Sequence, residues 1–262
     1  MNEKKNKSAR KVLLVGIAAV LVAAISVGST LAYLSAITTT ATNTFTASGN
    51  IKGRVLEPAW TSSVSSDASE YIPGRTYAKD PTVDNETSDA AVYVGAKLVF
   101  KVDVGDGAGF TTVSYDAFTH FVTLSANPGT NWTAVASTDA ELPADGATNK
   151  YYLYTPLLTK DADSGATYTD GATDHTTPLF ESVTPSKDIN IKSDGGATIS
   201  NVTANANLKS LVFKKFEFKI LVYAHGVKAY TVNSSTGAQV GGVLTTQDQA
   251  KTEILSKLAS KN

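Results

Sequence analysis

The chain has 262 residues, no cysteine and a formal net charge of −1 at pH 7. A chain of this length forms one large domain or two small ones, and it can bury a full core without covalent staples. The absence of cysteine excludes a disulfide framework, a thiolate zinc site and a cysteine nucleophile. The nearly balanced charge argues against nucleic-acid binding. With 42% hydrophobic residues and abundant Thr, Ser, Ala and Gly, the composition indicates an extracellular β-rich protein rather than a disordered one.

The first 32 residues have the organisation of a secretory signal peptide. Five basic residues lie within residues 4–11, and an apolar run of about 16 residues extends from Val12 to Val27. Small residues follow and lead to Ala32, which completes the order of a signal peptide. The run is shorter than the roughly 20 residues of a spanning helix. We therefore expect cleavage between Ala32 and Tyr33, with Ala36 as the alternative site.

Cleavage after Ala32 changes the charge of the mature protein. Residues 33–262 carry a net charge of −5, because the signal segment is basic. We expect three parts: a signal peptide over 1–32, an N-terminal strand segment over 33–55 and a β-sandwich domain over 56–262. The mature protein is expected in the extracellular matrix or at the cell surface, without a membrane segment after cleavage.

Residues 33–51 alternate in a pattern typical of an extended strand. The odd positions carry the larger side chains, including Tyr33, Ile37 and Phe45, and the even positions from 38 to 46 are all Thr. β-branched Thr favours extended backbone, and side chains along a strand alternate between its two faces. No close hairpin partner follows this segment. The strand therefore pairs either within its own sheet as an ordinary first strand, or with another chain.

Two further stretches have strong strand patterns. The even-numbered residues of 92–104 are apolar, whereas Tyr93, Lys97, Lys101 and Asp103 on the other face are expected to lie in water. Residues 212–224 also carry apolar side chains at most even positions. Weaker strands are predicted at 118–124, 132–136, 151–158, 189–191, 229–232 and 240–244.

The C-terminus changes from a strand period to a helical one. Thr246 and Gln249 have the spacing of a capping box. The apolar residues of the following segment fall on one helical face: Ala250, Ile254, Leu255 and Leu258. The fold class expected is all-β, an antiparallel β-sandwich with loop insertions and a short C-terminal helix packed against the sheets.

Two stretches of this sequence resemble a known family. The first comprises Ser29–Leu34 and Ala41–Ile51, with its Thr-Asn-Thr-Phe-Thr core; the second comprises Tyr71–Gly74, Lys79–Val83 and Ala91–Lys97. They resemble the TasA/camelysin family, which Gram-positive bacteria secrete and process with a SipW-type signal peptidase. The likeness covers roughly the first 105 residues and, more loosely, 216–224, whereas 106–207 show no match.

This resemblance implies a jelly-roll-like sandwich that forms biofilm-matrix fibres. The N-terminal strand of one subunit would complete a sheet of the next, which fits the alternating terminal segment. The assembly residues are then Tyr33, Leu34, Ile37 and Phe45. The implied partners are further copies of the chain, the SipW-type signal peptidase and an accessory matrix protein; no cofactor is implied.

An enzyme is the first alternative, because the camelysin branch is classed as metalloprotease-like. The sequence has no His-Glu-x-x-His motif, and His120, His175 and His225 lie 55 and 50 residues apart. It also lacks a Gly-x-Ser-x-Gly elbow and a phosphate-binding loop. We therefore expect no enzymatic activity, although a zinc site built from all three histidines would support a surface metalloprotease. A surface adhesin that binds through its loops is the other alternative.

One acidic loop offers a weak candidate calcium site. Asp161, Asp163 and Asp170, with Asp174 beyond, supply the oxygen ligands that calcium prefers. The EF-hand pattern fails, since the twelfth position of such a loop is Ala172 rather than Glu. The sequence therefore favours a solvated loop without bound metal.

Overall fold

The computed structural model describes only part of the chain. The described residues are 43–47, 51–61, 72–105, 107–161, 173–191, 197–199, 212–213, 216–233, 235–236, 238–240 and 244–261. The signal segment with its Ala32–Tyr33 junction lies outside them, as do Leu34, Ile37, Asp163 and Asp170. Of the helices within these ranges, none has the length and apolar character needed to span a membrane.

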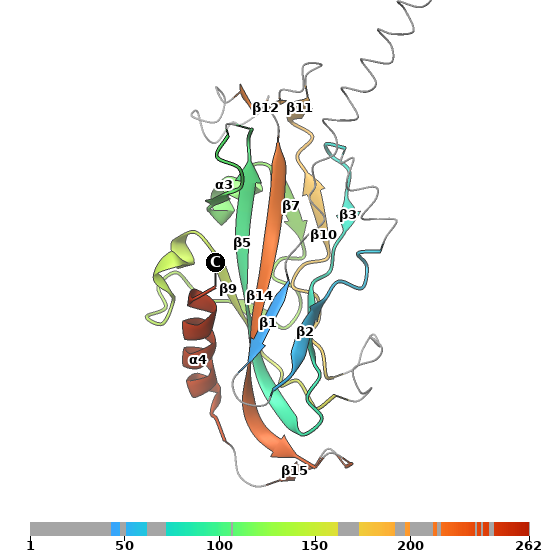
Figure 1. Ribbon diagram of the computed structural model, residues 1–262, viewed down its shortest axis with the longest axis vertical. Helices are drawn as coiled ribbons and strands as arrows, with labels where there is room; N and C mark the ends of the chain where they lie inside the picture. The colour runs from blue at the N-terminus through green and yellow to red at the C-terminus, as the bar shows by residue number, and fades with distance from the viewer. Residues whose placement is uncertain are drawn as a thin grey trace, which may run out of the picture.

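A seven-stranded sheet forms one layer of a β-sandwich (Figure 1). Two long antiparallel strands make its centre, β5 (Ala90–Asp103) and β14 (Glu217–Val232). The order across the sheet is β1-β14-β5-β9-β8, with β6 also on β5 and β15 also on β14. The bounds of these shorter strands are Thr44–Ala47 for β1, Thr111–Val113 for β6, Trp132–Ala134 for β8, Lys150–Tyr154 for β9 and Gln239–Val240 for β15.

Smaller sheets form the opposing layer. One has the order β3-β10-β7, and a two-stranded sheet pairs β2 with β4. A third, β11-β12-β13, lies near one end of the molecule in Figure 1. Their bounds are Gly53–Leu56 (β2), Tyr77–Ala78 (β3), Thr82–Asn85 (β4), Val122–Ser125 (β7), Ser182–Pro185 (β10), Ile189–Ile191 (β11), Ala197–Ile199 (β12) and Val212–Phe213 (β13).

The main core lies between these layers. The even-numbered apolar residues of β5 are buried there, as the alternation predicts, from Val92 through Val102. Phe100 and Phe218, from the two central strands, both contact Phe118, with ring centroids 4.8 and 5.8 Å apart. The predicted class, an all-β sandwich with a short C-terminal helix, is confirmed.

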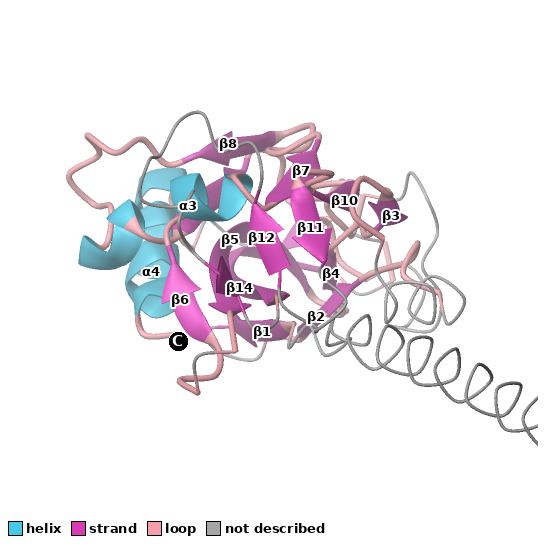
Figure 2. Cartoon of the chain, turned by 90° about the horizontal axis from the view of Figure 1, so that it is seen from above, coloured by secondary structure: helices cyan, strands magenta, loops and turns pink. Residues whose placement is uncertain are grey.

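A second core covers the outer face of the large sheet. Helix α4 (Gln247–Ala259) begins with the predicted capping box between Thr246 and Gln249. Its apolar face, confirmed as Ala250, Ile254, Leu255 and Leu258, packs on a set of residues from the sheet: Val99, Tyr151, Leu221, Tyr223 and Val227. Figure 2 shows α4 on one side of β5 and β14, with the smaller sheets on the other.

The helix overturns one expectation about β5. Lys97, expected in water, is fully buried because α4 covers that face of the sheet. Asp103 is also buried, and at the end of the strand its carboxylate accepts a hydrogen bond from the backbone N–H of Gly105. An alternating pattern identifies the more apolar face, but it does not report that another element covers the second one.

Two other expectations about the elements are wrong. The strand predicted over 118–124 is divided between helix α3 (Tyr115–Thr119) and β7, because the Ser114 side chain caps the helix by accepting from Ala117 N–H. The strand predicted at 229–232 is no separate element, since β14 runs without interruption from Glu217 to Val232. A register shift between Lys228 and Tyr230 marks an irregularity in that long strand.

Candidate assembly edge

The first described strand, β1, lies on an edge of the large sheet. It runs parallel to β14, with Thr44 beside Tyr223 and Ala47 beside Gly226. Every other pairing described in this sheet is antiparallel. A tight hairpin joins only antiparallel strands, so β1 cannot belong to a hairpin with β14. The edge position of β1 thus depends on contacts between segments far apart in the sequence.

The segment expected as one strand over 33–55 contains two strands within the described residues. β1 belongs to the large sheet, whereas β2 pairs with β4 in the opposing layer. The sequence Ser48-Gly49-Asn50 separates them, and Gly and Asn favour turns. The N-terminal part of the chain therefore contributes to both layers of the sandwich.

Phe45 anchors β1 to the sandwich. Its ring is half-buried and packs against the main core. Two glycines make room for it: a Cβ added at Gly53 would lie 2.6 Å from Phe45 Cζ, and one at Gly226 would lie 2.9 Å from the same atom. We call Gly53 and Gly226 the glycine socket. The absence of side chains there allows an aromatic ring to enter between the layers.

A polar contact joins the same two strands on the outer face. Thr46 and His225 are register partners, and Thr46 Oγ1 lies 2.9 Å from His225 Nδ1. His225 is only 2% exposed. Burial lowers the pKa of His225 to about 4, an effect that Glu253 opposes and Lys257 and Lys261 reinforce. The imidazole is therefore neutral at pH 7.

The three histidines do not form a metal site within the described residues. His120 follows the last residue of helix α3, and His225 lies within β14. His175 is buried, with its Nδ1 3.2 Å from Asp174 Oδ1. In the described part of the chain, no group of three or more His, Cys, Asp or Glu side chains could hold a metal ion. Of the candidate calcium ligands, Asp161 and Asp174 are described, and neither belongs to such a group.

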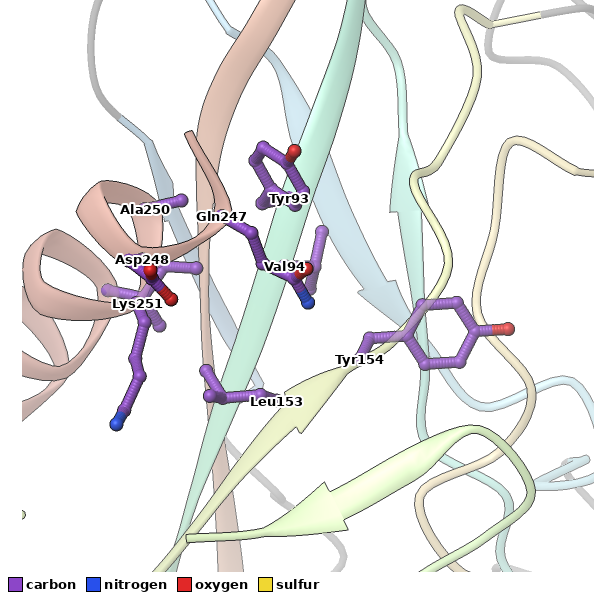
Figure 3. Close-up of a pocket in the computed structure, with 9 residues that line it drawn as sticks. Tyr93, Val94, Leu153, Tyr154, Gln247, Asp248, Ala250 and Lys251 are labelled. Carbon is purple, nitrogen blue, oxygen red and sulfur yellow. The ribbon is translucent and has the colours of Figure 1, made fainter. Parts of the chain in front are cut away.

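A cavity of about 270 Å³ lies where α4 begins, against β5 and β9. Figure 3 shows the side chain of Asp248 on the side of the helix toward the strands, whereas Lys251 points away from Tyr93 and Tyr154 points away from the helix. The amine of Lys251 is already bound to two carboxylates, with Nζ 2.7 Å from Asp139 Oδ2 and 3.1 Å from Glu141 Oε2. The cavity offers no nucleophile beside a general base.

Lys97 belongs to a buried polar cluster that the sequence did not reveal. Its Nζ lies 2.7 Å from Asp145 Oδ2 and donates to the backbone carbonyl of Lys261 at 2.5 Å. Partial burial would raise the pKa of Asp145, but hydrogen bonds from Lys97, Tyr151 and Asn149 outweigh it and lower that pKa. The cluster fastens the end of the chain beyond α4 to the large sheet, a structural role.

Comparison of this chain with protein-family models, with curated proteins and with solved structures found no match in any of the three. The function proposed below accordingly rests on the geometry of the β1–β14 edge and on the sequence around it.

Proposed function

We propose that this protein is a secreted structural subunit of an extracellular fibre, and that it assembles by donating its N-terminal strand to the next copy. The observation that carries the proposal is β1 itself: a four-residue parallel edge strand, anchored by one aromatic ring in the glycine socket. A secretory signal sequence that ends eleven residues before Asn43 agrees with an N-terminal strand set free by processing.

Strand exchange requires no new contacts. A second copy presents the same β14 edge and the same glycine socket, so its contacts with an incoming β1 replace those lost within the first copy. Residues 48–52 connect β1 to β2, and the six residue steps from Ala47 to Gly53 span at most about 22 Å. The β14 edge of the receiving copy must therefore lie within that distance of β2 in the donor.

In an assembled fibre, we expect the register of β1 to continue into the residues before it. Each residue of β1 pairs with the residue 179 positions further along the chain. Continued in an assembled fibre, this register sets Ile37 beside Phe216. Odd-numbered residues would then share the face of Phe45, the face on which Phe216, Phe218 and Ile220 join the main core. The apolar side of the 33–51 pattern thus matches the apolar side of β14.

The test compares two mature proteins by electron microscopy and sedimentation, one beginning at Tyr33 and the other at Ile51. We expect fibres from the first and monomers from the second. Within the longer protein, Ile37→Asp with Phe45→Asp should give folded monomers that do not polymerise, because both aspartates would face the core in the proposed register. The matched control is Thr38→Asp with Thr44→Asp, which adds the same charge on the opposite face and should still polymerise.

Three outcomes would count against the proposal. Fibres from the protein that begins at Ile51 would place the assembly contact outside the N-terminal strand. Equal polymerisation of the core-facing and outward-facing double variants would show that the pattern of the strand does not matter. If both proteins are folded and both remain monomeric, the purified chain does not assemble by itself.

A further inference from the structure

We propose that His225 is an acid-sensitive catch, which holds β1 on its own β14 while the imidazole is neutral and releases the strand when the ring is protonated. The catch is a property of the monomer. Its consequence, that acid exposes the edge to a second copy, rests on the proposed function.

The ring of His225 is almost closed to bulk solvent. Its register partner on β1 is Thr46, and on its other side it pairs with Gly95 of β5, which has no side chain. The Thr46 hydroxyl contacts Nδ1 directly. The ring is 2% exposed, so a proton added to it creates a charge in a dry site.

Nearby charged groups act on the imidazolium in both directions. From α4 and the residues after it, Glu253 favours the imidazolium, whereas Lys257 and Lys261 oppose it. β1 brings the Thr46 hydroxyl to the ring and no charged side chain, since the strand reads Thr-Phe-Thr-Ala. Burial is the largest influence and also disfavours the charged form. Protonation is therefore favourable only in a state where water reaches the ring.

Two elements cover His225, and β1 is the weaker of them. Helix α4 buries four apolar side chains on the sheet. Two hydrogen bonds also hold it in place: Lys97 donates to the Lys261 carbonyl just after the helix, and Lys251 of the helix donates to Asp139. β1 has four residues, one half-buried aromatic anchor and a position at the edge. The strand is thus expected to move before the helix does.

The test is hydrogen exchange of monomeric mature protein over a range of pH, with times corrected for the intrinsic exchange rate. If opening restores an ordinary histidine, protection of the β1 amides should fall about tenfold per pH unit between roughly pH 6.5 and pH 4. Amides of β5 and α4 should keep their protection over that range. In His225→Gln, which cannot be protonated, β1 protection should not depend on pH.

Three results would overturn the catch. They are β1 protection that does not change with pH, simultaneous loss of protection in β1 and α4, and the same pH dependence in His225→Gln as in the natural protein. If that variant does not fold, an NMR titration of the His225 ring in the natural protein replaces it. Ring protonation and β1 release must then share one midpoint, and separate midpoints refute the proposal.

Electron microscopy of the same samples separates this inference from the proposed function. Acid release of β1 without fibres at any pH would support the catch and refute the fibre proposal. Fibres that form equally at pH 7 and pH 4, with β1 protection unchanged, would support the fibre and refute the catch.

Discussion

The glycine socket leads to a quantitative prediction for Gly226→Ala. The added Cβ would meet Phe45 Cζ at 2.9 Å, closer than carbon atoms normally pack, with Ile51 Cγ2 at 3.8 Å as the next neighbour on that side. Overpacking of this kind costs about 1–3 kcal/mol. In a protein that already carries Phe45→Ala, the ring that the added Cβ would meet is absent. There the alanine should be neutral or stabilising by about 0.5 kcal/mol, because it restricts the unfolded chain.

Phe45→Ala alone has its own cost. A fully buried Phe loses about 3–5 kcal/mol on truncation, and the half-buried ring of Phe45 should lose about 2 kcal/mol. The double variant should then be more stable than the sum of the two single changes predicts, by about 1–3 kcal/mol. That difference measures the contact between the ring and the socket.

The assay is urea unfolding followed by tryptophan fluorescence, in which the buried Trp132 reports on the sandwich. The control combines Phe45→Ala with Gly146→Ala, since the three atoms nearest to a Cβ at Gly146 all belong to Leu142. That pair should be additive within about 0.5 kcal/mol. If the effects of Gly226→Ala and Phe45→Ala on the free energy of unfolding also add within this limit, the ring of Phe45 does not pack in the glycine socket.

Two further predictions concern other parts of the molecule. Lys97→Met should lower the free energy of unfolding by about 2 kcal/mol in chemical denaturation, because it removes the buried amine that donates to Asp145 and to the Lys261 carbonyl. An unchanged denaturation midpoint would show that this cluster does not stabilise the fold. Addition of a chelator should leave the Tm unchanged, as expected of a solvated loop around Asp161, whereas a lower Tm would indicate a bound divalent cation that stabilises the fold.

The elements set by local sequence were predictable. The even face of β5 is buried as its alternation indicates, and α4 has the expected cap and apolar face. Both are short-range patterns, in which neighbouring residues along the chain decide the structure. The division of 118–124 was missed because one serine cap, Ser114, outweighed an apolar run that is typical of a strand.

The features of the candidate site depend on distant contacts, which a single sequence does not report. Nothing near Lys97 indicates that a helix some 150 residues later covers it, nor that Asp145 pairs with it. Likewise, the alternation around Phe45 indicates a strand but does not name β14 as its partner or parallel as its direction. Gly53 and Gly226 gain their meaning only when the fold brings them to the same ring.

The long β5–β14 pair has a mechanical consequence. These two strands run along the longest axis of the molecule in Figure 1 and are paired over almost their whole length. A tensile force along that axis would load their hydrogen bonds together, as in shear, instead of breaking them one after another from an end. Along its middle part the pair is also covered on both faces, by the main core and by the core under α4. Stretching along this axis should therefore meet its greatest resistance in the middle of the large sheet, and its peripheral strands should detach first.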